Sequence, residues 1–345
     1  MRLVLVSYAM DSSSLVFAHQ VDLVRKLSSE FDEIIVFTRG KVNATLPSNV
    51  LVRTFLSRHY FSTIFFTFWC NYQVLLLLKA RRKFVVFSHM NETASAALGP
   101  LLRMFRVRHV LWYAHGATPL RLRIALRFVN AIVTSTPGSF RLKSWKVNVV
   151  GQAINNLRYV NLPEFRVREC INWCHIGRID PSKNIDLLLD FLARKVKENN
   201  KTRLTLYGQP SKDIYFEYLS DLKFRYQDLI DNQNLFFVGK LDHDKVAQTL
   251  HNHDLFVHAY IGSLDKSLLE ATLSGVPVLT LNQEYLNEFG SWSESENITL
   301  DLELDALQLK SQALVNNELQ RRKNIVESAH SLDSWIDKVK PILLG

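Results

Sequence analysis

Glu270 is the one acidic residue in the apolar run SLLEATLSGVPVLT, which covers residues 267–280. The pattern predicts a strand, a loop, a helix that begins near Ser267, a stop at Gly275 and a further strand. Free backbone N–H groups in the first helical turn, near Ser267 and Leu268, suit an anion. A nucleotide with phosphates on this turn and ribose hydroxyls on Glu270 would satisfy both groups. The alternative is a capping box formed by Ser267 and Glu270.

A second group of charged residues lies in the stretch CHIGRIDPSKNIDLLLDFL, residues 174–192. Arg178 and Lys183 flank a short turn between a strand-like run and an amphipathic helix. Both side chains suit a diphosphate, the arginine as a fork of donors and the lysine as a point charge. The alternative is an exposed turn in which Pro181 begins the helix.

Together the two stretches resemble the nucleotide-binding half of the family 4 retaining glycosyltransferases, which have the GT-B fold. In that family a Gly-Arg…Lys-Asn segment holds the donor diphosphate, and a Glu-x7-Glu motif follows on a later strand–helix unit. The same order, GRIDPSKN, RLTLYGQ, NLFFVGKL and DLFVHAYIGSLDKSLLEATLSGVPVL, runs through residues 171–281. The resemblance implies that Arg178 and Lys183 bind the diphosphate and Glu270 the ribose, with the base beside Val238 and Gly239. The expected donor-binding residues are Gly177, Arg178, Lys183, Val238, Gly239, Gly262, Ser263, Lys266, Ser267, Leu268 and Glu270.

The first Glu of the motif is missing, because its position is Gly262 here. In the family this Glu touches the hydroxyls of the donor sugar. The string GSLDKSLLEA looks like a branch of the family with a Gly-Ser-x-Asp-Lys loop in its place. We expect Asp265 or Ser263 to take over sugar recognition, and we assign Asp265 as a catalytic candidate. The alternative is a degenerate, inactive site.

The first half of the chain resembles the family more weakly. The stretch VLWYAHG places His115 after a strand, where family members carry a His that orients the donor sugar and stabilises charge at the anomeric centre. His115 is therefore the second catalytic candidate, although a lone His at a strand end is more often structural. Other polar clusters at strand ends are expected on the acceptor side, namely Asp11, Ser12, Ser13, Ser14, His89 and Asn91.

Short apolar, β-branched runs alternate with helical patterns along the chain. The runs RLVLVSY, EIIVFTR, FVVFSHM, HVLWYAH and AIVTST, and later INWCHIGR, RLTLYGQ, LFFVGK, DLFVHAY and VPVLTLN, predict buried parallel strands. Two such series predict two Rossmann-like α/β domains that face a central cleft. We expect an acceptor- and membrane-side domain over residues 1–160 and a nucleotide-sugar-binding domain over residues 161–325. A C-terminal helix within residues 326–345 is expected to pack back on the first domain.

Charge is divided unevenly between the two halves. Residues 1–165 contain 21 Lys and Arg against 7 Asp and Glu, a net of +14, whereas residues 166–345 contain 21 against 26, a net of −5. The basic half is expected to meet an anionic membrane surface or a phosphorylated substrate. Nucleic acid is not expected, because the basic residues are dispersed and match no RNA- or DNA-binding module. Cys170 and Cys174 have no partner pair at ligand spacing, so no metal site is expected.

The most hydrophobic stretch is YFSTIFFTFWCNYQVLLLLKARRK, residues 60–83. Its apolar runs are interrupted by Asn71 and Gln73 and are too short to span a bilayer. Aromatic residues with basic flanks favour a helix in the interface of an anionic membrane. The alternative is a crossover helix buried against the sheet. The apolar start of the chain reaches Asp11 too soon for a signal peptide and predicts a first strand instead.

The resemblance and the charge pattern together imply a retaining glycosyltransferase that moves a sugar from a UDP- or GDP-linked donor to a lipid-linked glycan acceptor. Such an enzyme would act in the biosynthesis of surface polysaccharide or glycolipid, in the cytoplasm, peripheral on the inner face of the plasma membrane. No cofactor and no metal are expected, because Arg178, Lys183 and the helix start offset the leaving diphosphate. Two alternatives stay open: an inactive homologue that serves as a membrane-associated partner, which Gly262 motivates, and a nucleotide-sugar epimerase.

Overall fold

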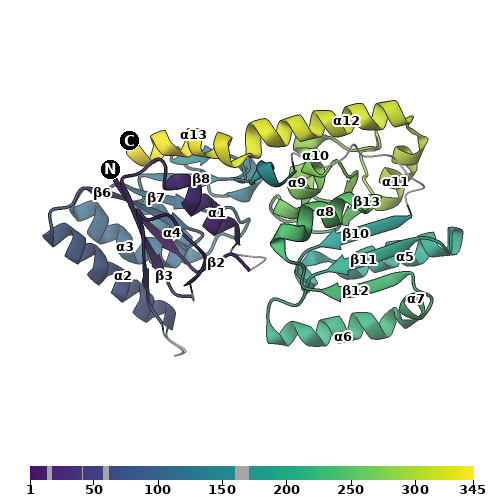
Figure 1. The fold of residues 1–345 in the computed structure, drawn as a ribbon, viewed down its shortest axis with the longest axis horizontal. Helices are drawn as coiled ribbons and strands as arrows, with labels where there is room; N and C mark the ends of the chain where they lie inside the picture. The colour runs from purple at the N-terminus through teal and green to yellow at the C-terminus, as the bar shows by residue number, and fades with distance from the viewer. Residues whose placement is uncertain (14–17, 41, 57–61, 160–170) are drawn as a thin grey trace. The chain divides into compact units, whose positions relative to one another are not determined.

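The protein divides into two compact units in the computed structural model (Figure 1). Unit 1 comprises Met1–Asn155 and Ala329–Gly345, and unit 2 comprises Asn156–Ser328. The C-terminal helix thus belongs to unit 1, although the chain reaches it through unit 2. The structure describes residues 1–13, 18–40, 42–56, 62–159 and 171–345.

Unit 1 is built on a seven-stranded sheet in which every pair of neighbouring strands is parallel. In spatial order the strands are β5 (Val50–Thr54), β3 (Glu33–Thr38), β1 (Arg2–Ser7), β6 (Phe84–His89), β7 (His109–Trp112), β8 (Ala131–Thr134) and β9 (Val147–Val149). The helices are α1 (Ala18–Leu27), α2 (Ser62–Lys79), α3 (Glu92–Met104), α4 (Leu120–Phe128) and α13 (Leu332–Leu344). A short pair, β2 (Met10–Asp11) and β4 (Val42–Asn43), stands apart from this sheet.

Alternate residues of each central strand face opposite layers of helices. In β1, Leu3 and Leu5 pack in a cluster with α1 and α13, whereas Val4 and Val6 pack in a cluster with α2 and α3. This is the period of two that a strand buried on both faces imposes, and it explains why the strand sequence is apolar throughout. The indole of Trp335 in α13 is fully buried, so the C-terminal helix is part of the core of unit 1.

Unit 2 has a five-stranded parallel sheet. Its order is β12 (Leu235–Gly239), β11 (Arg203–Tyr207), β10 (Asn172–Ile176), β13 (Leu255–His258) and β14 (Val278–Thr280). The helices are α5 (Ile185–Glu198), α6 (Phe216–Arg225), α7 (Gln227–Asp231), α8 (Val246–His251), α9 (Lys266–Leu273), α10 (Gln283–Phe289), α11 (Leu300–Leu309) and α12 (Gln312–Ile325). Each strand predicted for the two sheets is present, so the prediction of two Rossmann-like parallel domains is confirmed.

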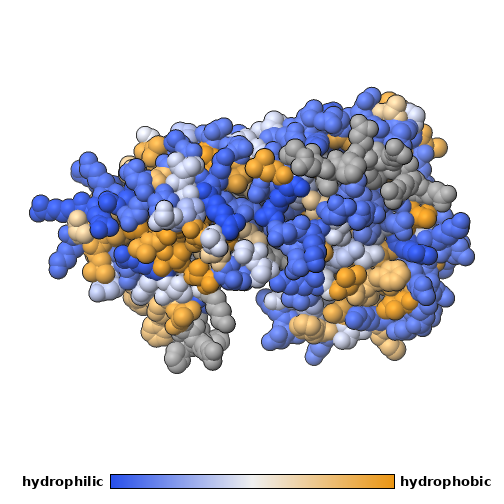
Figure 2. Space-filling view, viewed as in Figure 1, coloured by the Kyte–Doolittle hydropathy of each residue, from blue (hydrophilic) through white to orange (hydrophobic). Residues whose placement is uncertain are grey.

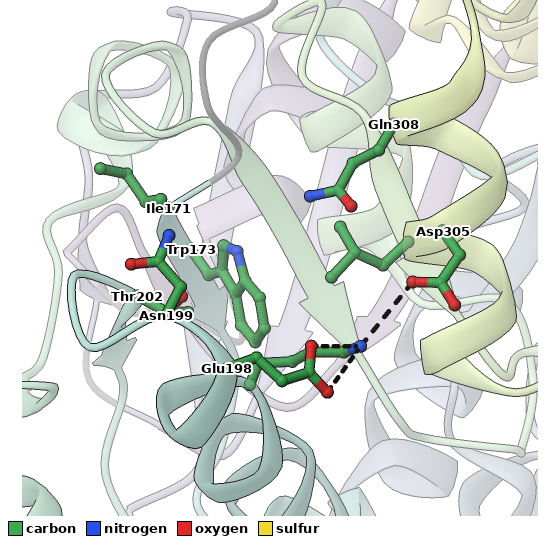
Figure 3. Close-up of a pocket in the computed structure, with 9 residues that line it drawn as sticks. Ile171, Trp173, Glu198, Asn199, Thr202, Asp305 and Gln308 are labelled. Atoms are coloured by element: carbon green, nitrogen blue, oxygen red, sulfur yellow. Dashed lines mark hydrogen bonds and ion pairs between the residues drawn. The ribbon is translucent and has the colours of Figure 1, made fainter.

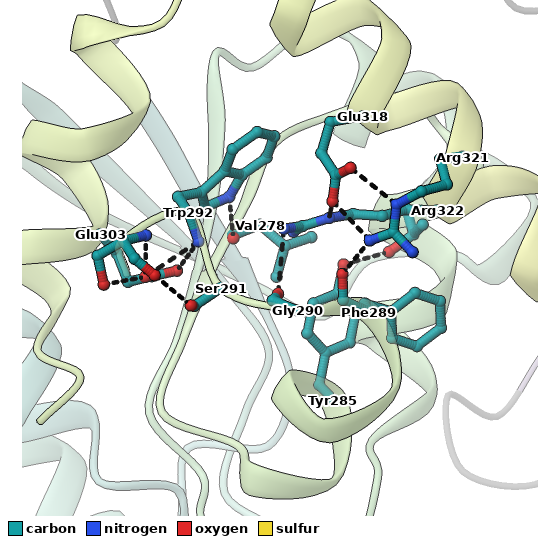
Figure 4. A network of polar contacts seen from close by, with 12 residues as sticks. Val278, Tyr285, Phe289, Gly290, Ser291, Trp292, Glu303, Glu318, Arg321 and Arg322 are labelled. Atoms are coloured by element: carbon teal, nitrogen blue, oxygen red, sulfur yellow. Dashed lines mark hydrogen bonds and ion pairs between the residues drawn. The ribbon is translucent and has the colours of Figure 1, made fainter. Parts of the chain in front are cut away.

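A buried polar network joins α11 and α12 to the loop after α10 (Figure 4). The guanidinium of Arg322 lies over the Trp292 ring at 4.2 Å and donates to Glu318 at 2.8 Å and to the Gly290 carbonyl at 3.0 Å. The buried Glu303 carboxylate accepts from the Trp292 backbone N–H at 3.0 Å. Because these charged groups are paired and hydrogen-bonded, they are tolerated inside unit 2. The acidic segment from Asp301 to Asp305, which carries Glu303, lies within α11.

Helix α2 corresponds to the hydrophobic stretch singled out in the sequence. One face, which carries Phe66, Cys70, Val74 and Leu77, is buried against the sheet and α3, as expected of a crossover helix. The opposite face is also apolar and is exposed. Within the described ranges, no helix has the length and apolar character needed to cross a bilayer.

Candidate functional site

Glycines lie at the carboxyl ends of three neighbouring strands of unit 2 and let these ends approach one another. The Gly177 N–H donates to the Tyr207 carbonyl at 3.0 Å, and the Gly208 N–H donates to the Gly239 carbonyl at 2.7 Å. A Cβ at Gly208 would lie 1.7 Å from the Gly177 carbonyl oxygen, and the φ of Gly208 is +148°. Both facts restrict this position to glycine. Carboxyl ends of parallel strands are the usual ligand edge of an α/β sheet.

Arg178 lies at this edge and is held from one side. Its guanidinium forms an ion pair with Asp180 at 3.1 Å, and its side chain is 48% exposed. Asp180 is itself buried and accepts from the backbone N–H and hydroxyl of Ser211 at 2.9 and 2.7 Å. The guanidinium is therefore oriented by a fixed carboxylate and keeps donors available for an anion.

Lys183 ends the 3₁₀ turn Pro181–Lys183 and is buried, with 5% of the residue exposed. Its ammonium forms an ion pair with the Asp265 carboxylate and lies 3.9 Å from the centroid of the Tyr260 ring. The alternative of an exposed turn is therefore wrong for Lys183, although Pro181 and Ser182 before it are exposed. Burial is possible because the carboxylate and the aromatic face both compensate the ammonium.

Asp265 connects Lys183 to a buried histidine. Its Oδ2 lies 3.4 Å from Nε2 of His258, whose Nδ1 contacts the Thr280 hydroxyl at 3.1 Å. Burial alone would raise the pKa of the Asp265 carboxyl, but the Lys183 ammonium and His258 outweigh it and hold that pKa well below its ordinary value. Asp265 is therefore ionised and already engaged by two side chains of unit 2.

Two asparagines fix the loop between β13 and α9. The Asn184 amide donates to the Ala259 carbonyl at 3.0 Å. The fully buried Asn282 amide donates to the carbonyls of Tyr260 at 3.0 Å, Gly262 at 3.1 Å and Ser263 at 3.4 Å. Buried amides that satisfy several backbone carbonyls hold a loop rigid, so the segment that carries Gly262 and Ser263 has a defined position.

Helix α9 begins two residues earlier than the capping-box alternative requires. Asp265 is the N-cap and Lys266 is the first helical residue, so Ser267 and Glu270 lie inside the helix and form no capping box. Backbone donors of the first turn, which includes Ser267 and Leu268, are consequently oriented along the axis at the N-terminus. Ser267 and Leu268 themselves are buried.

Glu270 is half-buried one turn into α9. Burial raises the pKa of its carboxyl to about 7, and Asp265 adds to this effect, while Lys266 and Arg158 act in the opposite direction. A carboxyl whose pKa is raised to near neutrality by burial is typical of functional sites.

Sequence reasoning missed a group of residues beside Glu270. Arg158 and Tyr159 belong to the 3₁₀ turn Asn156–Tyr159, far from the motif in sequence, yet both interact electrostatically with the Glu270 carboxylate. Arg158 also pairs with Asp244 at 2.6 Å. No pattern in the sequence connects residue 158 to residue 270.

The remaining predicted donor residues lie at the end of β12. Val238 is 56% exposed, and Gly239 has a φ of +87° with no atom within 4 Å of where a Cβ would lie. Together with Gly177, Arg178 and the α9 turn, they occupy the carboxyl edge of one sheet.

The predicted acceptor-side residues of unit 1 are unequally placed. His115 is exposed after β7, and its Nδ1 accepts from the Ala117 N–H at 3.1 Å. His89 is buried and stacks on Trp112, with ring centroids 5.9 Å apart. Asn91 is buried, and its side chain caps α3 by accepting from Ala94 N–H at 3.0 Å. These contacts favour a structural role for His89 and Asn91.

The chain forms a local turn at the end of β2. The Asp11 carboxylate accepts from the Ser13 N–H and hydroxyl at 2.9 and 2.7 Å, and the Ser12 hydroxyl donates to the Asn43 carbonyl at 2.9 Å. Ser14, the last member of the predicted acceptor-side set, lies outside the described residues.

Residues 172–331 match the protein family described as Glycosyl transferases group 1. This segment contains all of the residues from Gly177 to Asn282 that are described above at the carboxyl edge of the unit 2 sheet. By sequence, no curated protein matches the chain.

The whole chain is similar in structure to solved glycosyltransferases. Anabaena HepE in complex with UDP superposes with a TM-score of 0.76 at 12% identity, over 100% of both chains. WaaG, a glycosyltransferase involved in lipopolysaccharide biosynthesis, superposes with a TM-score of 0.68 at 14% identity, over 99% of this chain and 100% of that one. The lipopolysaccharide outer core galactosyltransferase WaaB gives 0.67 at 12% identity, over 99% and 100%. The predicted GT-B fold is confirmed.

A small cavity of about 80 Å³ lies at the opposite edge of the unit 2 sheet (Figure 3). It is lined by Ile171 and Thr202, which directly precede β10 and β11, and by residues of α5 and α11. Among the described residues that line it, the one cation is Lys195, which pairs with Glu198 at 3.1 Å and Asp301 at 3.4 Å. Because it opens at the amino ends of the strands, this cavity is separate from the carboxyl edge that carries Gly177, Gly208 and Gly239.

Proposed function

We propose that this protein is a glycosyltransferase that takes its sugar from a nucleotide-sugar donor held at the carboxyl edge of the unit 2 sheet. The observation that carries the proposal is the convergence of Arg178, Lys183, the α9 N-terminus and Glu270 on that edge. The family match over residues 172–331 and the similarity to a UDP complex of HepE support it. The donor is a UDP or GDP sugar.

The diphosphate of the donor would lie on the cationic side of this edge. Arg178 offers an exposed fork of donors, and α9 offers backbone N–H groups and the positive end of its dipole. Lys183 is already paired with Asp265, so it would share its ammonium between the carboxylate and a phosphate oxygen. We propose that these groups stabilise the leaving diphosphate without a metal ion, and that the transfer retains anomeric configuration.

Asp265 acts as a positioning residue in this proposal. Its carboxylate is held by Lys183 and His258, so it fixes the lysine rather than contacting the sugar. The catalytic candidate that remains is His115 of unit 1, whose imidazole is exposed at a strand end. It would orient the donor sugar and stabilise charge at the anomeric centre.

Nucleotide affinity is expected to rise with pH through about 7. Ribose hydroxyls donate to a carboxylate, so binding favours ionised Glu270, whose pKa is about 7 in the free protein. Below that pH the carboxyl must first release its proton, which makes UDP binding roughly tenfold weaker at pH 6 than at pH 8. Calorimetry on wild type and Glu270→Gln checks this. The variant should keep only the pH dependence of UDP itself; equal profiles for both proteins would contradict the assignment.

We further propose that unit 1 binds an anionic membrane surface, where a lipid-linked glycan acceptor would be reached. The exposed face of α2 carries Ile64, Phe65, Phe68, Tyr72, Leu75 and Leu76, and Figure 2 shows apolar surface gathered over this part of unit 1. Between Glu33 and Asn155, within unit 1, the sequence has 17 Lys and Arg and one acidic residue, Glu92. Glu92 is buried and paired with Arg121 at 2.5 Å, so it offsets little of the positive charge.

The Phe65→Ser/Phe68→Ser variant is expected to lose at least three quarters of its binding to vesicles of anionic lipid, because two aromatic side chains no longer enter the interface. Co-sedimentation at low and high salt measures this. Phe224→Ser, which removes an 82% exposed aromatic side chain from unit 2, is the control and should bind like wild type. Wild type that does not sediment with anionic vesicles at low salt would refute the membrane proposal.

Transfer itself is tested with radiolabelled UDP and GDP sugars and a membrane lipid extract. We expect label in the lipid fraction with wild type and at least tenfold less with Arg178→Ala. Conversion of the donor to its epimer without any acceptor would show the epimerase alternative. Nucleotide binding without donor turnover would show the inactive homologue.

A further inference from the structure

Gly262 is the position at which the chain departs from the Glu-x7-Glu pattern, and a tyrosine side chain occupies the space there. A Cβ at Gly262 would lie 2.0 Å from the Tyr260 hydroxyl oxygen and 2.1 Å from the ring carbon that bears it. No side chain fits at residue 262 while the phenol has this position. The phenol thus lies on the side of the loop toward which a glutamate at 262 would project.

The phenol is held in this position by its surroundings. The Asn282 amide fixes the backbone of Tyr260 and Gly262. The Tyr260 ring covers the Lys183 ammonium at 3.9 Å and meets the His258 ring edge-to-face, with centroids 6.2 Å apart. The Tyr260 ring is held by the Lys183 ammonium on one face and by the rigid loop that carries it, so its hydroxyl is pre-organised for a ligand.

The hydroxyl of Tyr260 remains available to a ligand. Tyr260 is partly exposed, and within the described parts of the chain its hydroxyl has no hydrogen-bond partner. The loop's own carboxylate, Asp265, is engaged by Lys183 and His258. A phenol both donates and accepts, so it can bind a sugar hydroxyl in either sense.

We propose that Tyr260 contacts the sugar of the nucleotide-sugar donor and that its hydroxyl does so in place of the missing glutamate. This inference rests on the proposed function and names a specificity residue within it. A tyrosine hydroxyl in place of the glutamate keeps a hydrogen-bonding group beside the sugar. It does so without placing another negative charge near Asp265, Glu270 and the diphosphate. The same ring keeps the Lys183 ammonium in place, so Tyr260 links sugar recognition to diphosphate binding.

The test compares UDP with UDP-glucose, UDP-galactose and UDP-N-acetylglucosamine by calorimetry. Tyr260→Phe keeps the ring over Lys183 and removes only the hydroxyl. We expect it to bind the tightest of the three UDP sugars about three- to tenfold more weakly than wild type, with UDP affinity unchanged. Tyr226→Phe is the matched control, because its ring also lies beside a cation, Arg225 at 5.4 Å, but its hydroxyl contacts Asp190.

A second experiment removes the tyrosine side chain and then restores a glutamate at residue 262. Tyr260→Ala should lose the preference for the UDP sugar, and Tyr260→Ala/Gly262→Glu should regain part of it, because the glutamate then has room. Wild-type protein that binds no nucleotide would overturn the proposed function and this inference together. Protein that binds UDP and its sugars, with Tyr260→Phe indistinguishable from wild type, would overturn the role of Tyr260 alone.

Discussion

The Lys183→Met variant is expected to lose about 3 kcal/mol of unfolding free energy and at least tenfold in affinity for UDP. Methionine fills a similar volume but leaves the Asp265 carboxylate without its main charge partner. It also removes the positive charge of the Lys183 ammonium, which we propose binds the diphosphate of the donor. Urea denaturation measures the first effect and calorimetry the second.

A double variant separates the two consequences of losing Lys183. Lys183→Met/Asp265→Leu removes both charges, so most of the lost unfolding free energy should return while UDP affinity stays low. Arg178→Met serves for comparison, because the Arg178 side chain is half-exposed and Asp180 keeps its hydrogen bonds from Ser211, so the loss should be less than about 1 kcal/mol. If the double variant is no more stable than Lys183→Met, the buried pair is not the source of the loss.

Gly208→Ala is expected to cost about 3 kcal/mol of unfolding free energy, because a Cβ would overlap the Gly177 carbonyl and the backbone has positive φ. Gly239→Ala is the matched control at the next strand end. Gly239 also has positive φ, but no atom lies within 4 Å of its missing Cβ, so it should cost about 1 kcal/mol. Denaturant titration of both variants checks the difference, and equal losses would show that the contact with Gly177 is unimportant.

The central strands were predictable because burial on both faces requires continuous apolar runs. The strands β5 (Val50–Thr54) and β9 (Val147–Val149) were not predicted, and both lie at edges of the unit 1 sheet where one side is exposed. Edge strands need no long apolar run, so their sequences resemble loops. The aromatic residues and basic flanks of α2 indicated a helix but left its partner open, since both of its faces are apolar.

Motif spacing placed Arg178, Lys183 and Glu270 at one edge of a sheet, because strand–loop–helix order fixes where such residues emerge. It could not show that Lys183 is buried, since its partner Asp265 is 82 residues away in sequence. The same holds for Tyr260, which fills the space at Gly262 through a contact that no helical or strand period encodes. Glycines at the carboxyl ends of β10, β11 and β12 are a sequence signal for the ligand edge, although the family motif assigns only Gly177 and Gly239 and not Gly208.

Calorimetric titration of UDP and GDP tests most directly whether a nucleotide binds at this edge of unit 2. We expect one of the two to bind wild type with micromolar affinity. Glu270→Ala and Arg178→Ala should each weaken that binding about ten- to a hundredfold, because each removes charge-assisted hydrogen bonds. Wild type that binds neither nucleotide, or variants that bind as tightly as wild type, would contradict the donor site described here.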